Sequence, residues 1–185
     1  MAPSALRSVV EGLIFSSDFP LKAEIIREIL GKPAKGEIER VLDELSQEYR
    51  DPNHGFELVQ VAEGYQFRTK PEHSEWIRKL RKSRASRLTR SSMEVLAIIA
   101  YKQPIIRTEI EEIRGVDSAS VLRTLLERRL IRILGRRDVP GRPIVYGTTR
   151  EFLEVFGLRS LSDLPTLREI EELHKEEPSP VNPPE

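Results

Sequence analysis

The chain has 185 residues, of which 38% are hydrophobic and 32% are charged. This composition excludes wholesale disorder, and the length allows one or two compact units. Because the chain contains no cysteine, it can form no disulfide or thiolate metal site and offers no thiol nucleophile. Glu11 and Gly12 interrupt the longest apolar run near the N-terminus, so we expect no export signal, no membrane span and a cytoplasmic location.

The formal net charge is zero, but the charges are unevenly distributed. Residues 1–80 contain 11 basic and 14 acidic side chains, residues 81–157 contain 16 and 9, and residues 158–185 contain 3 and 7. The net charges of these segments are therefore −3, +7 and −4. We predict an N-terminal domain at 1–80, a basic linker at 81–91, a C-terminal domain at 92–157, and an acidic, proline-rich extension at 158–185 with a disordered end.

Three apolar stripes with helical spacing occupy the first part of the chain. They lie at residues 6–14, 21–30 and 38–49, and they predict three helices. The period then changes, because residues 56–61 and 65–69 are short runs rich in β-branched and aromatic side chains. This pattern predicts a β-hairpin with residues 62–64 between its strands.

The second part of the chain repeats this order of elements. Helices are predicted at residues 93–101 with Ser91 or Ser92 as cap, at 107–114 with Gly115 as stop, and after an Asp117 or Ser118 cap. Strands are predicted at 131–134 and 144–147 around a turn-rich loop, then a short helix at 151–156 and a packed or partner-dependent helix at 158–173. Three helices and a hairpin are typical of a winged-helix domain. The predicted fold class is therefore mainly α with small β-hairpins (α+β), arranged as two tandem winged-helix domains.

The sequence does not favour catalysis. His54, His73 and His174 are far apart, and no neighbouring carboxylate or histidine pattern marks a metal site or a catalytic triad. The glycines of residues 135–141 match neither a phosphate-binding loop nor a dinucleotide fingerprint, and a hairpin turn explains them. We therefore expect a protein that is not an enzyme and that uses no cofactor and no metal.

DNA binding is the alternative function, because winged-helix domains often place the third helix in the major groove and the wing on the phosphate backbone. The candidate contacts are Arg123 on the predicted third helix and Arg136, Arg137 and Arg142 on the predicted wing. The acidic third helix of the first domain would repel phosphates. The alternatives are a transcriptional regulator, a weak contact that is indifferent to base sequence, or a solvated, ion-paired surface.

A role in protein assembly is favoured by residues 93–101, which are apolar on almost every side of a helix. Such a helix is either central to a core or buries a second face against another segment or chain. Aromatic, aliphatic and arginine side chains, which dominate interface hot spots, gather where Pro104 ends this helix. The predicted partner-binding residues are Tyr101, Gln103, Pro104, Ile105 and Arg107, with Arg114 as a charged anchor nearby. Alternatively, Tyr101 and Ile105 only complete the core of the domain.

Several ordered motifs resemble the segregation and condensation protein B family. They are LAIIAYKQPI at residues 96–105, EIRGV at 112–116, VLRTLLER at 121–128, PGRP at 140–143, YGTT at 146–149 and LP at 164–165. The resemblance covers about residues 93–165, and it is looser at EGLIF (11–15) and GYQF (64–67).

This resemblance implies a homodimer, joined through its N-terminal domains, that binds the kleisin of a structural-maintenance-of-chromosomes (SMC) complex. It further implies a part in chromosome condensation and partition, with the nucleoid reached through the SMC ATPase and no catalysis by this chain. The residues favour dimerisation independently. Phe15, Phe19 and the stripes of the first two predicted helices offer more apolar surface than one small core needs.

Overall fold

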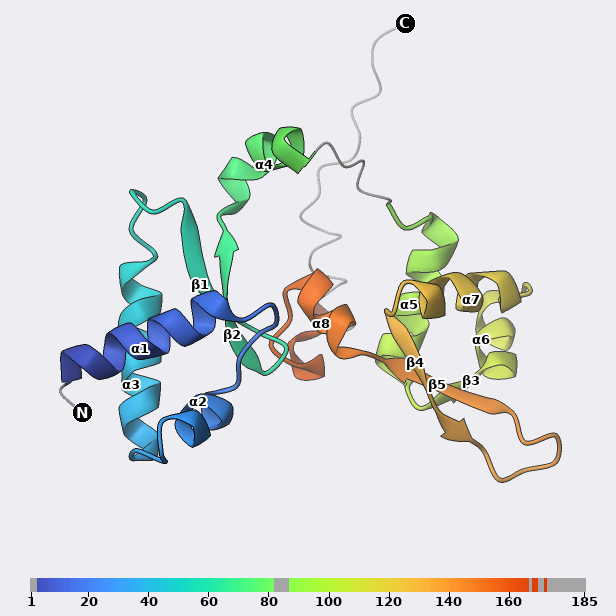
Figure 1. Ribbon diagram of the computed structural model, residues 1–185. Coiled ribbons are helices and arrows are strands. Elements are labelled where there is room, and N and C mark those ends of the chain that lie inside the picture. Colours follow the sequence, from blue (N-terminus) through green and yellow to red (C-terminus); the bar gives the residue numbers. More distant parts are fainter. Residues whose placement is uncertain (1–2, 82–86, 167, 170–171, 173–185) are drawn as a thin grey trace, which may run out of the picture.

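The computed structural model describes residues 3–81, 87–166, 168–169 and 172 (Figure 1). Its helices and small antiparallel sheets confirm the α+β fold class. The middle of the predicted linker, His174 and the end of the predicted extension lie outside the described residues. Among the residues that are described, no helix is both long and apolar enough to cross a membrane.

The first half of the chain folds as three helices followed by a hairpin, as predicted. The elements are α1 (Pro3–Ser16), α2 (Ala23–Ile29), α3 (Lys35–Glu48), β1 (Phe56–Val61) and β2 (Gly64–Thr69). A short 3-10 helix at Pro71–His73 and helix α4 (Ser74–Arg81) follow. Val10, Ile26 and Leu42 come from the three predicted stripes, and all are fully buried in one hydrophobic cluster. The helical spacing of the sequence therefore forms this core.

An aromatic cluster at the end of α3 joins the first hairpin to the helices. Tyr49 stacks on Phe56 with the ring centroids 5.1 Å apart, and it meets Phe67 edge-on at 4.8 Å. The Tyr49 hydroxyl donates a hydrogen bond to the Glu11 carboxylate on α1, and this bond raises the pKa of Tyr49 to about 12. One side chain thus ties α1, α3 and the hairpin together.

The turn of this hairpin is tighter than the sequence predicts. Ala62 and Glu63 alone separate the strands, and both adopt the left-handed backbone conformation, with φ of 48° and 60°. Gly64 is already the first residue of β2. A Cβ atom on Gly64 would stand 2.8 Å from the backbone of Pro20, so this position requires glycine.

The second half repeats the order of three helices and a hairpin, with one added strand. The elements are α5 (Arg90–Lys102), β3 (Ile105–Ile106), α6 (Arg107–Arg114), α7 (Ala119–Glu127), β4 (Ile131–Arg136) and β5 (Ile144–Thr148). Helix α8 (Arg150–Phe156) and a 3-10 helix at Leu161–Asp163 come next. Strand β3 pairs with β5, which gives the sheet order β3-β5-β4. The sequence did not predict β3, because a two-residue strand is too short to show a period.

Two local predictions for the second half are wrong. Thr89 caps α5 instead of Ser91 or Ser92: its hydroxyl accepts a hydrogen bond from the Ser92 amide at 3.2 Å, and the helix begins one residue after Thr89. The helix predicted at 158–173 is absent from residues 158–160 and 164–166, whereas the described residues Arg168, Glu169 and Glu172 are helical. The carbonyls of Leu158 and Arg159 bond instead to the first hairpin, and the 3-10 helix at Leu161–Asp163 follows them.

Two glycine variants test the close contact at the hairpin. Gly64→Ala should lower the free energy of unfolding by about 1–3 kcal/mol, because its methyl group meets the Pro20 backbone, which cannot swing aside. Gly36→Ala on α3 is the matched control. No heavy atom lies within 4 Å of its Cβ position, and alanine in a helix is favoured over glycine by about 0.5–1 kcal/mol. Urea unfolding measures both changes, and a Gly64→Ala protein as stable as the parent would contradict the contact.

Candidate partner-binding surface

Helix α5 is the central helix of the second half. Val95, Leu96 and Ile99 are at most 1% exposed, and they share a hydrophobic cluster with residues of α6, α7 and the sheet. This core accounts for most of the apolar character of the helix. Ile105 belongs to the same cluster, because it is 3% exposed and pairs with Tyr146 on β5. Ile105 therefore supports the predicted surface from beneath and presents almost no area to a partner.

Tyr101 lies at the exposed end of α5. Its side chain is 44% exposed, and its hydroxyl donates a hydrogen bond of 2.6 Å to the carbonyl of Pro165. The ring is thus fixed against the segment that follows α8 while much of its area stays open to solvent. An aromatic side chain held in one orientation at the surface is suited to anchor a partner, because little rotamer entropy is lost on binding.

Gln103 joins the end of α5 to strand β5. Its side-chain carbonyl accepts the Thr148 amide at 2.8 Å, and its side-chain amide donates to the Thr148 hydroxyl at 3.0 Å and to the Ala100 carbonyl at 3.2 Å. A Cβ atom on Gly147 would stand 2.8 Å from the side-chain oxygen Oε1 of Gln103, so strand β5 passes close to the Gln103 side chain. The peptide between Gln103 and Pro104 is cis. Through its hydrogen bonds to Thr148 and Ala100, Gln103 holds the backbone of the predicted surface from within the fold.

The two predicted arginines of this surface differ in their surroundings. Arg107 is half exposed and pairs with Glu111, at 2.6 Å, and with Asp117. The amide of Ser118 and the Arg107 guanidinium together lower the pKa of Glu111. Arg114 has a side chain only 9% exposed, and it bonds to Ser118 at 3.0 Å and to Glu94 at 3.3 Å. Arg107 can reach a partner, whereas Arg114 braces α5, α6 and the start of α7.

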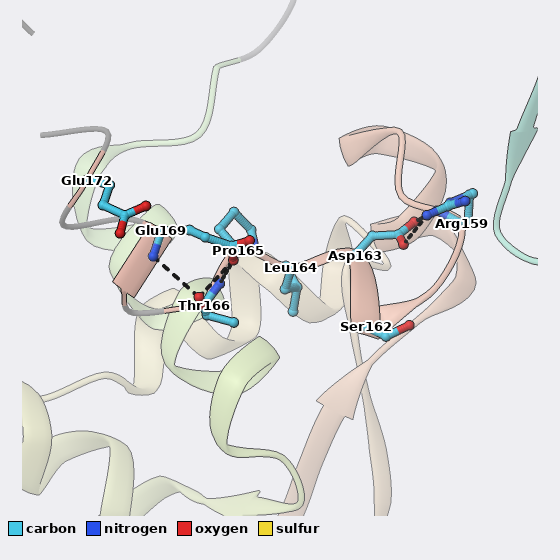
Figure 2. Close-up of a pocket in the computed structure, with 8 residues that line it drawn as sticks. All are labelled: Arg159, Ser162, Asp163, Leu164, Pro165, Thr166, Glu169 and Glu172. Carbon is cyan, nitrogen blue, oxygen red and sulfur yellow. Dashed lines mark hydrogen bonds and ion pairs between the residues drawn. The ribbon is translucent and has the colours of Figure 1, made fainter. Parts of the chain in front are cut away.

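A depression of about 670 Å³ opens along the segment that Tyr101 contacts (Figure 2). Arg159 and Asp163 form an ion pair at 2.9 Å at one end, and Thr166 donates to Glu169 at 2.7 Å at the other. An apolar stretch that includes Pro165 lies between them. No chemical motif marks this lining, and only its LP pair, at residues 164–165, belongs to the motifs of the family resemblance.

The candidate DNA contacts do not form one free basic surface. Arg136 and Arg142 are exposed on the wing, where a guanidinium nitrogen of Arg136 donates to the Arg142 carbonyl at 3.0 Å. Arg137 instead forms two hydrogen bonds with Glu109, at 2.5 and 3.2 Å, and these bonds lower the pKa of Glu109. Arg123 pairs with an acid one turn along α7. The structure thus brings three of the four together and neutralises one of those three.

The part of the chain that the structure describes contains no arrangement of side chains suited to ligate a metal ion. No group of three or more histidine, aspartate or glutamate side chains there is placed to hold an ion. Several acids of this half are instead paired with arginines, as Glu111 is with Arg107.

Comparison with known proteins gives consistent matches over most of the chain. A family model described as "Segregation and condensation complex subunit ScpB" matches residues 8–167. The segregation and condensation protein B of Syntrophotalea carbinolica is 52% identical over 94% of this chain and 88% of its own length. That of Bacillus cereus is 46% identical over 90% of this chain and 88% of its own length. A crystal structure of a dimer of the ScpB N-terminal domain complexed with ScpA peptide covers 43% of this chain and 99% of its own, at 30% identity and a TM-score of 0.40.

A substitution at Gln103 separates a supporting residue from an exposed one. Gln103→Ala should lower the free energy of unfolding by about 1–3 kcal/mol, because the buried Thr148 amide loses its acceptor. Lys102→Ala, on the neighbouring exposed position of α5, is the control and should change stability by less than about 0.5 kcal/mol. Thermal and urea unfolding give both values. Equal stabilities of the two variants would mean that Gln103 does not hold α5 to β5.

Proposed function

The chain belongs to the ScpB family of segregation and condensation complex subunits, and from this premise we propose that it acts as a homodimeric, non-enzymatic subunit that binds an ScpA-like kleisin. Through the kleisin it joins an SMC ATPase and takes part in chromosome condensation and partition. ATP hydrolysis belongs to that ATPase, so this chain positions its partners without turning over a substrate or using a cofactor. It works in the cytoplasm, at the nucleoid.

The observation that carries this proposal is the family match over residues 8–167, which includes both halves of the chain. The structure adds a surface of suitable chemistry at the end of α5. Tyr101 and Arg107 are exposed there, next to the backbone that Gln103 and Pro104 shape. Tyrosine and arginine are among the residues that contribute most to binding at protein interfaces. We therefore assign kleisin binding to Tyr101 and Arg107, with Gln103, Pro104, Ile105 and Arg114 as their support.

Kleisin capture by a double variant tests this assignment. Tyr101→Ala with Arg107→Ala should weaken binding at least about tenfold, because both exposed anchors are lost while the core stays intact. The matched control is Arg123→Ala with Tyr101→Phe, which removes one exposed arginine and keeps the ring. Binding of co-expressed ScpA-like kleisin is measured by pull-down and calorimetry, with the melting temperature as a check of folding. Undiminished capture by the folded Tyr101→Ala, Arg107→Ala protein would reject this surface.

Dimerisation is assigned to the first half, where α1 and α2 leave large apolar side chains uncovered. Phe15 is 75% exposed, Ile29 is 56% exposed and Phe19 is 52% exposed, with the Arg150 guanidinium 5.8 Å from the centre of the Phe19 ring. Apolar side chains that a single chain leaves in water become buried when a second copy packs on them. The homodimer prediction therefore rests on Phe15, Ile29 and the helix faces that carry them.

Sedimentation of charge variants tests the dimer surface. Phe15→Glu with Ile29→Glu should convert the dimer to a monomer at about 10–50 μM chain, because each glutamate would have to be buried unpaired in the interface. Val139→Glu, at an exposed apolar residue of the wing loop, should leave the dimer intact. A parent chain that sediments as a monomer at this concentration, or a dimer that survives the double substitution, would place the interface elsewhere.

The remaining sequence predictions also stay proposals. Family membership gives no support to the alternative of a transcriptional regulator. A weak DNA contact that is indifferent to base sequence remains proposed for Arg123, Arg136, Arg137 and Arg142, with the ion pair to Glu109 reducing the share of Arg137. The division into domains at 1–80 and 92–157 is likewise proposed, and the two separate hydrophobic clusters support it.

A further inference from the structure

The two halves of the chain touch through the turn of the first hairpin. The backbone amides of Ala62 and Glu63 donate to the carbonyls of Leu158 and Arg159, and both hydrogen bonds are 2.8 Å long. Ala62 is a turn residue and is nevertheless only 1% exposed. Turn residues are usually open to solvent. The segment after α8 therefore covers this turn, and Figure 1 shows α8 lying between the β1–β2 hairpin and the second half.

Two arginines reinforce this contact in opposite directions. Arg68 of β2 donates to the carbonyl of Glu154 at 2.9 Å and so satisfies a carbonyl in the last turn of α8. Arg150, at the start of α8, donates to the carbonyl of Pro20 and lies over the ring of Phe19. Each half thus sends one guanidinium into the other. We name the contacts of Ala62, Glu63, Arg68 and Arg150 with the opposite half the interdomain latch.

The conformation of the turn fits a role in the latch. Left-handed residues in such hairpin turns are most often asparagine or glycine, and this chain has Ala62 and Glu63 there. Glu63 also forms an ion pair with Lys22, and this bond lowers the pKa of the Glu63 carboxyl. The turn is therefore held in place by its own half while its two amides face the other half.

The segment after α8 that covers the turn, residues 158–165 and here called the covering segment, continues from the latch to the candidate partner-binding surface. Leu158 and Arg159 contact the first half, and Pro165, a few residues later, accepts the hydrogen bond of Tyr101 on α5. The groove between the halves has a volume of about 540 Å³ and is lined by both Glu63 and Gln103. One short segment thus reaches from the first hairpin to the end of α5.

We propose that the interdomain latch, and not the linker, fixes the orientation of the two halves, so that the dimer surface and the surface at Tyr101 are presented at a constant angle. Domains joined by a linker move relative to one another by default unless an interface holds them. The latch supplies two backbone hydrogen bonds, a cation over an aromatic ring, and two hydrogen bonds from partly buried arginine side chains to backbone carbonyls. The fixed orientation itself needs no kleisin, and only the identity of the two surfaces that it presents rests on the proposed function.

Distance measurements between spin labels test the latch in the full chain. The absence of cysteine allows specific labelling of Gln47→Cys on α3 and Glu112→Cys on α6, two exposed positions in different halves. Labelled chain is mixed with an excess of unlabelled chain, so that each dimer carries at most one labelled copy. The parent should give one narrow distance distribution. Arg68→Ala with Arg150→Ala should broaden it about twofold or more, because free domains sample many orientations.

The control removes two arginines that lie outside the latch. Arg90→Ala with Arg123→Ala takes away side chains that are 95% and 82% exposed and should leave the distribution narrow. A broad distribution in the parent would overturn the proposal, as would a narrow one that the Arg68→Ala, Arg150→Ala variant leaves unchanged. Circular dichroism confirms that every variant is folded.

A disulfide in a second variant shows which copy of the chain supplies the covering segment. Glu63→Cys with Ser160→Cys places two thiols beside the hydrogen bond between residues 63 and 159. Oxidation should give a cross-link within one chain, which runs as a monomer on a non-reducing gel. A covalent dimer would overturn the proposal as stated, because the segment would then come from the second copy. Failure to cross-link, with both thiols still reactive, would overturn it as well.

Discussion

The second half of the protein is organised by the burial of helix α5. A helix that is apolar on nearly every side cannot remain at the surface of a small unit, so other elements have to cover it. Ile110 of α6, Leu125 of α7 and Ile131 of β4 provide this cover, and each is almost completely buried. The arginines of α7 and of the wing consequently lie on the outside. The same constraint that builds the core thus decides which side chains are left for partners.

At its C-terminal end, helix α5 leaves the core and contributes to the protein surface. Gln103 fastens the helix end to β5, and Ile105 starts the short strand that adds to the sheet. Both residues are engaged in contacts within the domain, and they hold the backbone between them in place. Of Tyr101, Gln103 and Ile105, Tyr101 is the one whose side chain stays exposed to solvent. A surface built this way is preorganised, so a partner that binds it loses little free energy to ordering.

The sequence predicts the parts of the fold that depend on a local period. The stripes that contain Val10, Ile26 and Leu42 repeat at helical spacing, and the structure places all three in one core. The burial of Ile105 depends instead on pairing with Tyr146, which is distant in the sequence. The cap of α5 was misassigned because Thr89, Ser91 and Ser92 carry equivalent hydroxyls, and only the helix start selects one of them.

The candidate site shows a second limit of sequence reasoning. Residue types predict a partner-binding site at the end of α5, which stays a prediction, and they could not separate exposed Arg107 from Arg114, which is bonded to Glu94 and Ser118. That difference arises from the packing of α5 against α6. The latch could not be predicted from the sequence. It depends on the backbone amides of Ala62 and Glu63, and every residue except proline has such an amide.

The covering segment gives the two proposed surfaces a common structural element. Its carbonyls at Leu158 and Arg159 are bonded to the first half, and its carbonyl at Pro165 is bonded to Tyr101. A partner that binds the Tyr101 ring would therefore lie next to a residue whose segment is anchored on the first half, to which we assign dimerisation. If that partner shifts the ring, the hydrogen bond to Pro165 must break or the segment must follow. Because the segment is short and held at both ends, the latch that we propose also holds the backbone to which the Tyr101 ring is bonded, so the ring is presented to a partner in a fixed place.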